Sequence, residues 1–428
     1  MKKKVLVVGP TLSQSGYGVH ARTVLNALRS RQDVFDIYIH NLNWGHTSWL
    51  WEDTEDRRWI DATLLKTVHH RQNNGTFDLS LQVTIPNEWE KVAPINIGCT
   101  AGIETNLISP VWVEKSYMMD KIIVVSEFAK QGFVNTVYEA INQNTQQPEQ
   151  VSAKGPIDVI NYPLLQTQAC NIELDLKHDF NFLTIAQWSP RKNLENTIRW
   201  FIEEFHDQEV GLVVKTSTAN NSYMDRLATR NNLKKLLGDP KYSERICSLH
   251  FLHGYLKDEE MSALYQDSRI KALVNIAHGE GYGLPIFEMA GHGKPIITTA
   301  FGGQTDFLYV PEKVKGQRKK KLMPKFAEVE FKMAPVQQEA VWDGVLQADS
   351  QWAYADPGSY KMKLRDVYKK YSMHEKRAKV LQSHIIEHFT EQRIYTQFVE
   401  SIGEVIDLST EEFDVEEWLE ALNVETHE

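Results

Sequence analysis

Short apolar runs alternate with segments of helical spacing through most of the chain. In the first half, the apolar runs occupy residues 4–8, 34–40, 78–84, 95–101, 121–126 and 157–165. After the first run, Val19, Val24, Leu25 and Leu28 recur near the spacing of an amphipathic helix. Because strands that alternate with helices are covered on both faces, the pattern predicts a parallel sheet.

The second half repeats this alternation. Its apolar runs occupy residues 180–187, 211–217, 247–254, 271–277 and 294–303. Helical spacing follows the first of these runs, where Leu194, Ile198, Phe201 and Phe205 share one face. We therefore predict an α/β fold class, with two Rossmann-like parallel-sheet domains that face each other across a cleft. Ligands of such sheets bind at the carboxyl ends of the strands.

Domain boundaries follow from length and from changes in composition. A chain of 428 residues exceeds the size at which one core stops growing, so two domains are expected. The polar segment 166–179 is typical of a linker, which places an N-terminal domain at 1–166 and a C-terminal domain at 177–385. Residues 386–428 are expected to form a helical segment that packs back on the N-terminal domain and ends in an acidic tail. The polar stretch 142–156 is expected to be a surface loop.

Composition narrows the class of protein. A net charge of -10 and a pI near 5.9 argue against a protein whose whole surface binds nucleic acid or anionic lipid. The three cysteines, Cys99, Cys170 and Cys247, lie far apart without metal-binding spacing, which favours a reducing compartment and no structural zinc site. No apolar run is long enough for a membrane span, so we expect a cytoplasmic protein without a transmembrane segment.

The richest candidate site is the segment 278–306. An apolar run leads into a turn with Gly279, Gly281 and Gly283, and Pro285 then begins a helix. A helix N-terminus carries unpaired N–H groups, so the turn is a candidate anion site. Glu280 in the turn and Glu288 in the helix would suit the hydroxyls of a sugar or ribose. The alternative is an ordinary strand–turn–helix unit with a solvated glutamate.

Other candidates follow the strands of the first half. Gly16 and Gly18 flank Tyr17 just before a predicted helix, where the backbone must approach either a ligand phosphate or a neighbouring strand. His20 borders this glycine loop. The segment after residues 95–101 offers Glu104 and Thr105.

Four motifs together resemble the retaining glycosyltransferases of family 4, which have the GT-B fold. The motifs are GEGYGLPIFE with its Glu-x7-Glu spacing, QWSPRKN, LHGYLKDEEMSALY and the N-terminal SGYG. The resemblance covers residues 181–307 well and the first half loosely. It implies transfer of a hexose-type sugar, with retention of configuration, from a UDP- or GDP-sugar donor to a hydroxyl acceptor such as a glycan or glycolipid.

By resemblance, Glu280 contacts hydroxyls of the donor sugar, Glu288 binds the ribose, and Lys192 holds the diphosphate. The chain departs from the family at Gln187, where an arginine is usual, and a neutral amide cannot neutralise a pyrophosphate. Either Arg191 or Lys215 would then supply the second cation. We favour Lys215, because it stands at the end of a strand.

The catalytic residues expected on this basis are Glu280, Lys192 and Lys215. Backbone amides of the turn formed by Gly281, Tyr282 and Gly283 would help to bind the donor, together with the residues of the N-terminal glycine loop, Gly16 and Gly18. The acceptor would lie near Tyr17, His20, Glu104 and Thr105. The resemblance implies that the donor phosphate takes the acceptor proton, so neither a cofactor nor a metal ion is required.

Two local segments leave alternatives open. Residues 41–53 contain three tryptophans, which form either a small local core, the interpretation we favour, or an acceptor-facing surface. The acids at 52–56 are expected to be solvated. The cationic run 313–325 is expected to be a solvated loop, although contact with phosphate or an anionic lipid surface is the alternative.

Competing functions also remain open. The basic run motivates a glycosyltransferase that modifies DNA bases, although the acidic balance of the chain opposes it. Gln187 motivates a GT-B module that binds a nucleotide or glycan without turnover. A nucleotide-sugar 2-epimerase or a phosphorylase would be an enzyme of another class on the same fold.

Overall fold

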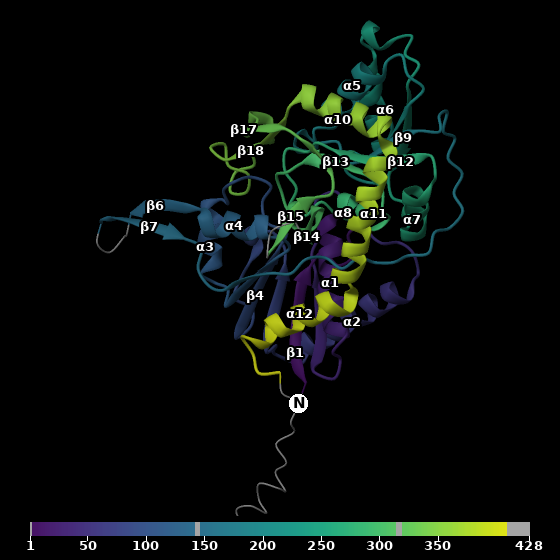
Figure 1. Ribbon diagram of the computed structural model, residues 1–428. Coiled ribbons are helices and arrows are strands. Elements are labelled where there is room, and N and C mark those ends of the chain that lie inside the picture. The colour runs from purple at the N-terminus through teal and green to yellow at the C-terminus, as the bar shows by residue number, and fades with distance from the viewer. Residues whose placement is uncertain (1, 142–145, 314–318, 409–428) are drawn as a thin grey trace, which may run out of the picture.

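The computed structural model describes residues 2–141, 146–313 and 319–408, and it contains two α/β lobes (Figure 1). Each lobe is built on a six-stranded sheet whose paired strands run parallel. The N-terminal sheet has the order β2 (Phe35–Asn41), β1 (Lys3–Gly9), β3 (Leu79–Val83), β4 (Ile95–Thr100), β5 (Lys121–Val124) and β8 (Ile157–Val159). The C-terminal sheet has the order β11 (Ser248–His253), β10 (Gly211–Thr216), β9 (Asn181–Ile185), β12 (Ile270–Asn275), β13 (Ile296–Thr299) and β16 (Ala327–Val329). The predicted fold class is confirmed.

Helices follow most of these strands, because the sheets are apolar on both faces and need cover on each. The N-terminal lobe contains α1 (Gly16–Arg29), α2 (Glu55–Gln72), α3 (Pro110–Ser116) and α4 (Glu127–Asn135). The C-terminal lobe contains α5 (Leu194–Phe205), α6 (Tyr223–Leu237), α7 (Asp258–Gln266), α8 (Leu284–Gly291) and α9 (Thr305–Leu308). Short 3-10 turns lie at η1 (Pro86–Glu88), η2 (Pro190–Lys192), η3 (Pro240–Tyr242) and η4 (Gln338–Ala340).

Three helices close the described part of the chain. They are α10 (Pro357–Lys369), α11 (Tyr371–His388) and α12 (Glu391–Gly403), in a region expected to be helical. Leu381 of α11 shares a core with the C-terminal lobe, whereas Ile394 and Phe398 of α12 share one with Val24 of α1. The chain therefore returns to the N-terminal lobe after crossing the C-terminal one (Figure 1). The expected acidic tail, residues 409–428, lies outside the described residues.

The surface loop expected at 142–156 is corrected in part. The described residues of this stretch include β7 (Pro148–Ser152), which pairs antiparallel with β6 (Val137–Ile141) in a projecting hairpin (Figure 1). Side chains of both strands are exposed or only half-buried. Backbone hydrogen bonds hold the two strands together, so the mainly polar residues of β7 form a strand without an apolar pattern. Residues 142–145 lie outside the described part.

The solvated loop expected at 313–325 is corrected in part, because its described second half is solvated but forms a strand. Lys320–Pro324 forms β15, which pairs antiparallel with β14 (Tyr309–Lys313). Residues 314–318 of the run lie outside the described residues. A further antiparallel pair, β17 (Phe331–Pro335) and β18 (Gln351–Ala355), follows.

Residues 331–355 form an arm that leaves the C-terminal lobe and packs on the N-terminal one. Trp352 is fully buried in a core that also contains Trp89, Trp112 and Phe133 of the N-terminal lobe. Asn106 hydrogen-bonds through its backbone N–H to the carbonyl of Gln351, and Ser109 Oγ donates to the carbonyl of Gly344 at 2.7 Å. The arm therefore joins the lobes through a hydrophobic core.

The local tryptophan core expected at 41–53 is wrong. The side chains of Trp49 and Trp51 are 46% and 69% exposed. Trp44 instead lies against Tyr17, with ring centroids 4.5 Å apart. The segment runs across the edge of both lobes, so no apolar shell surrounds its tryptophans.

No described helix is long and apolar enough to cross a membrane. The described residues also contain no group of three or more metal-ligating side chains placed to hold an ion.

Candidate functional site

The C-terminal sheet brings two loops together at the point where its strand order reverses. β9 lies between β10 and β12, so the chain leaves β9 toward one side of the sheet and later returns on the other. The loop after β9 contains Arg191 and Lys192 in the turn η2, and the loop after β12 contains Glu280. Such a switch point is where open α/β sheets bind ligands.

Lys192 and Glu280 form the centre of this junction. Lys192 Nζ lies 2.6 and 2.7 Å from the two carboxylate oxygens of Glu280, and Asn275 Nδ2 donates to Oε1 at 3.1 Å. Glu280 is 6% exposed. Burial alone would raise the pKa of Glu280, but the charges of Lys192 and Arg191 hold it below its usual value, so the carboxylate is ionised. Burial and the nearby guanidinium lower the pKa of Lys192.

Arg191 extends the cluster to the other lobe. Its Nη1 donates to the carbonyl of Gly279 at 2.9 Å and lies 3.4 Å from Glu280, while its Nη2 lies 3.2 Å from Glu104 of the N-terminal lobe. Two cations and two carboxylates therefore meet between the lobes. A phosphate bound here could form ion pairs with Arg191 and Lys192, which the two carboxylates already hold in position.

Glycine is required where the turn touches the N-terminal lobe. A Cβ added to Gly279 would lie 2.0 Å from the carbonyl oxygen of Glu104, and one added to Gly281 would lie 2.4 Å from that of Ala101. Gly283 immediately precedes α8 as its N-cap, with a φ of 88°, which favours glycine. The strand, turn and helix predicted around Pro285 are present, and the turn packs directly on the opposite lobe.

Glu288 lies in a second polar group on α8. Its carboxylate accepts a hydrogen bond from Tyr265 Oη at 2.6 Å. Burial raises the pKa of Glu288 to about 7. Lys215 donates from Nζ to the carbonyl of Gly254 at 2.9 Å, and burial lowers its pKa while the charge of Glu288 opposes that effect.

Gln187 and Tyr282 lie apart from these two groups. Gln187 is exposed, and its side-chain amide donates to the carbonyl of Thr218 at 2.7 Å. Tyr282 is buried in the apolar core beside Phe287 and Phe307. The structure therefore assembles Arg191 with Lys192 and Glu280, and it leaves Gln187 at the surface.

The glycine loop of the N-terminal lobe belongs to α1 itself. The helix begins at Gly16, and the cap Ser15 accepts a hydrogen bond from the N–H of Gly18 at 3.1 Å. Nothing lies within 4 Å of a Cβ built on Gly16, whereas one on Gly18 would meet the carbonyl of Ser13. Gly18 is needed for this internal contact.

The remaining N-terminal candidates have internal partners. Tyr17 Oη lies 2.9 Å from Thr100 Oγ1 and accepts from the N–H of Ala101 at 3.3 Å. Burial raises the pKa of Tyr17 far above its usual value. Thr105 is buried and donates to the carbonyl of Leu107 at 2.9 Å. Of the four residues predicted to lie near the acceptor, Tyr17, His20, Glu104 and Thr105, it is Glu104 that joins the charged cluster, through Arg191.

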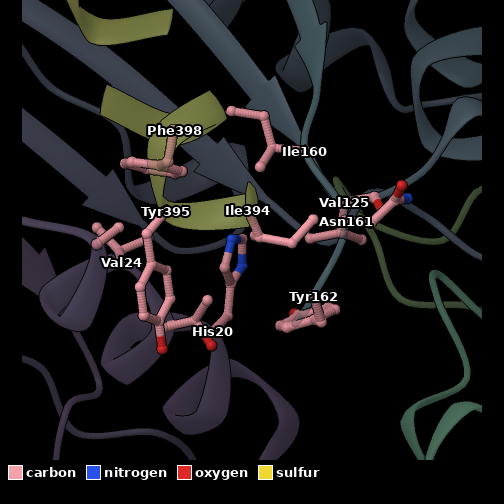
Figure 2. Close-up of a pocket in the computed structure, with 11 residues that line it drawn as sticks. His20, Val24, Val125, Ile160, Asn161, Tyr162, Ile394, Tyr395 and Phe398 are labelled. Atoms are coloured by element: carbon pink, nitrogen blue, oxygen red, sulfur yellow. The ribbon is translucent and has the colours of Figure 1, made fainter. Parts of the chain in front are cut away.

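His20 lines a small internal cavity. Figure 2 shows its ring among Val24, Tyr162, Ile394 and other apolar side chains from α1, α12 and the strand ends. Burial lowers the pKa of His20 to about 3, so the ring is neutral at pH 7. His20 packs α12 against the N-terminal lobe.

Sequence reasoning missed several residues of the junction. Asn275 and Tyr265 hold the two glutamates, and nothing in the local sequence distinguishes Tyr265. Asp306 accepts hydrogen bonds from the backbone N–H of Glu127 at 2.9 Å and from Asn161 Nδ2 at 3.0 Å, which ties the lobes together. A polar residue at the carboxyl end of a predicted strand is the signal that could have found Asn275, which ends β12, whereas Asp306 lies in α9.

Comparison with known proteins identifies the fold. Sucrose-phosphate synthase from Thermosynechococcus elongatus matches with a TM-score of 0.62 and 12% identity over 95% of this chain and 100% of that one. Anabaena HepE in complex with UDP-glucose matches with a TM-score of 0.59 and 12% identity over 94% and 100%. An Escherichia coli trehalose-6-phosphate structure bound with UDP-2-fluoro glucose matches with a TM-score of 0.56 and 10% identity over 94% and 99%.

These matches confirm the two-lobed GT-B architecture over nearly the whole chain, and at this identity they establish the fold alone. No family model matches the chain, and no curated protein is significantly similar to it.

Proposed function

We propose that the protein is a glycosyltransferase that uses a nucleotide sugar as donor. The observation that carries this proposal is the convergence of Arg191 and Lys192 on Glu280 at the switch point of the C-terminal sheet. Cations and a carboxylate at one point suit a ligand with both phosphates and hydroxyls. Solved structures with the same fold are bound with UDP-glucose or UDP-2-fluoro glucose, which supports this ligand class.

Each group has a role in this proposal. Lys192 and Arg191 neutralise the donor diphosphate, which removes the need for an arginine at Gln187. Glu280, once Lys192 turns to the phosphate, accepts hydrogen bonds from the sugar hydroxyls. Glu288 accepts hydrogen bonds from the ribose, and Lys215 supports the charge near it. In contrast to the sequence-based preference for Lys215, the geometry favours Arg191 as the second cation.

The reaction breaks the bond between the sugar C1 and the diphosphate oxygen and forms one from C1 to the acceptor hydroxyl oxygen. The acceptor proton passes to the departing phosphate oxygen. This transfer neutralises the positive charge on the attacking oxygen and part of the negative charge on the leaving group, so no protein base is needed. Lys192 and Arg191 stabilise the charge that develops on the leaving diphosphate. Retention of configuration and family 4 membership are part of the proposal, on the strength of the Glu-x7-Glu resemblance.

A glycan or glycolipid is the acceptor that the exposed aromatic side chains support. Ser48 accepts a hydrogen bond from the backbone N–H of Asn221 at 3.0 Å, and Asn221 Oδ1 accepts one from the N–H of Tyr255 at 2.7 Å. These bonds gather an aromatic rim that spans both lobes. Its exposed aromatic members are Trp49, Trp51, Tyr223 and Tyr255, and the exposed Met224 follows Tyr223 in the chain. Exposed apolar patches mark binding surfaces, and aromatic faces suit the C–H face of a sugar ring.

Replacing Trp51 with alanine is expected to raise the KM for a glycan acceptor about 5- to 10-fold while kcat changes little, because stacking energy is lost from binding alone. Initial rates against acceptor concentration measure this. Trp342→Ala is the matched control, because its side chain is 61% exposed on the arm, away from the rim. An acceptor KM within twofold of the native value in Trp51→Ala would remove the rim from the acceptor site.

Donor affinity is expected to depend on pH through Glu288. Its pKa is raised to about 7, so the carboxylate that accepts from two ribose hydroxyls predominates only above pH 7. Below that pH the Kd for a nucleoside diphosphate should increase, by up to about tenfold per pH unit. Calorimetric titration between pH 5.5 and 8.5 measures it. In the control variant Glu288→Gln only the ligand phosphate still titrates, so the Kd should depend less strongly on pH. An equal dependence of the Kd on pH in the native protein and in Glu288→Gln would contradict the role of Glu288 in binding the ribose.

The function itself is tested by release of nucleoside diphosphate. Purified protein is incubated with a panel of UDP- and GDP-sugars, with and without glycan, glycolipid and duplex DNA acceptors. We expect release that requires one donor and is stimulated by a glycan or glycolipid. Tight donor binding without release would favour the non-catalytic module, and transfer to DNA would favour the base-modifying alternative.

A further inference from the structure

The hairpin of β14 and β15 carries exposed positive charge that the proposed transfer reaction does not use. The segment 313–325 has seven Lys or Arg residues and no Asp or Glu, in a chain of net charge -10. The described residues of the hairpin contain four of these cations, Lys313, Lys319, Lys320 and Lys321. We call the exposed side of residues 309–313 and 319–324 the basic hairpin.

The strand register decides which side chains share its outer face. Pro311 pairs with Leu322, and Lys313 pairs with Lys320, so these four side chains project from one face. All four are exposed, and Leu322 is 60% exposed. Val310 on the opposite face is buried in the core of the C-terminal lobe. The hairpin is therefore anchored by its inner face, and its outer face presents Leu322 beside the pair of Lys313 and Lys320.

These lysines have no carboxylate partner in the described part of the chain. Lys325 pairs with Glu312 at 2.6 Å, which uses the one acid of the hairpin. No described carboxylate lies within 4 Å of the amines of Lys313, Lys319, Lys320 or Lys321. Lys313 and Lys320 stand directly opposite each other, and like charges in that position repel. A multivalent anionic surface would relieve the repulsion.

We propose that the basic hairpin docks the protein on an anionic lipid surface. Lysines at the level of the headgroups attract anionic lipid, and the exposed leucine beside them inserts at the boundary of the acyl chains. The leucine distinguishes lipid from nucleic acid, because a phosphate backbone offers no apolar layer to receive it. The overall negative charge also opposes broad binding to DNA.

Co-sedimentation of the full-length protein with vesicles tests the proposal without any donor or acceptor, so its outcome is independent of the transfer activity. We expect binding to vesicles of phosphatidylcholine with 30% phosphatidylglycerol, and none to phosphatidylcholine alone. Lys313→Ala/Lys320→Ala should lower the partition coefficient about 25-fold, at about fivefold per lysine. Leu322→Ser should lower it about tenfold.

The matched control is Lys234→Ala/Lys235→Ala, which removes two adjacent exposed lysines from α6 and should leave binding unchanged. Melting temperatures establish that the variants are folded. An equal loss of vesicle binding in the control variant would overturn the proposal. So would equal binding to vesicles with and without phosphatidylglycerol. Tighter binding to duplex DNA than to anionic vesicles at 0.15 M salt, lost in Lys313→Ala/Lys320→Ala, would assign the hairpin to nucleic acid instead.

Discussion

Replacing Lys192 with glutamine is expected to lower kcat/KM for sugar transfer by about 100- to 1,000-fold, the usual effect of removing a positioned donor from a developing oxyanion. The amine lies within 2.7 Å of both oxygens of Glu280, so it is already at the junction before a donor arrives. Glutamine retains a hydrogen bond to Glu280 while removing the charge. Nucleoside diphosphate release under subsaturating donor measures the effect.

A second lysine serves as the control for charge removal. Lys361 pairs with Glu203 at the surface of α10, so Lys361→Gln should leave kcat/KM within twofold of the native value. Circular dichroism of both variants separates loss of activity from loss of fold. A Lys192→Gln enzyme with near-native kcat/KM would show that the diphosphate binds elsewhere.

Replacing Trp352 with alanine is expected to cost about 3–5 kcal/mol of stability, as large-to-small changes in a core do. The side chain is fully buried among N-terminal residues and stacks on His278, with centroids 4.9 Å apart. Because His278 lies two residues before Glu280, donor affinity should fall as well. Chemical denaturation measures the stability, and calorimetric titration measures the affinity.

Trp342 provides the comparison on the same arm. Its ring is 61% exposed, so Trp342→Ala should change the free energy of unfolding by about 0.5 kcal/mol or less. If Trp352→Ala were equally mild, the arm would not be joining the lobes through a core. A large effect in Trp352→Ala alone supports an arm that holds the two lobes in register.

The sheets were predictable because strands buried on both faces are continuous apolar runs, as in residues 271–277. The β6–β7 hairpin was not, because its residues are exposed or half-buried and need no apolar pattern. The tryptophans of 41–53 were misjudged because composition alone does not tell a core from a rim, whereas Trp51 is exposed.

The candidate site was predictable in its parts but not in its assembly. The glycine turn with Glu280 and the nearby Lys192 were found from motif spacing. Their contact depends on β9 and β12 being neighbours, which is a property of the strand order. The pairing of Arg191 with Glu104 depends in addition on how the lobes face each other, so no local pattern contains it. The roles proposed for these residues, and the domain boundaries, remain predictions.

The most direct test of the nucleotide-sugar site is a crystal structure of the protein with a nucleoside diphosphate. We expect the diphosphate to contact Lys192 and Arg191 at the junction, with Glu280 released from Lys192 and the ribose hydroxyls bonded to Glu288. A diphosphate bound away from the loops after β9 and β12, with the ion pair between Lys192 and Glu280 intact, would contradict the proposed function.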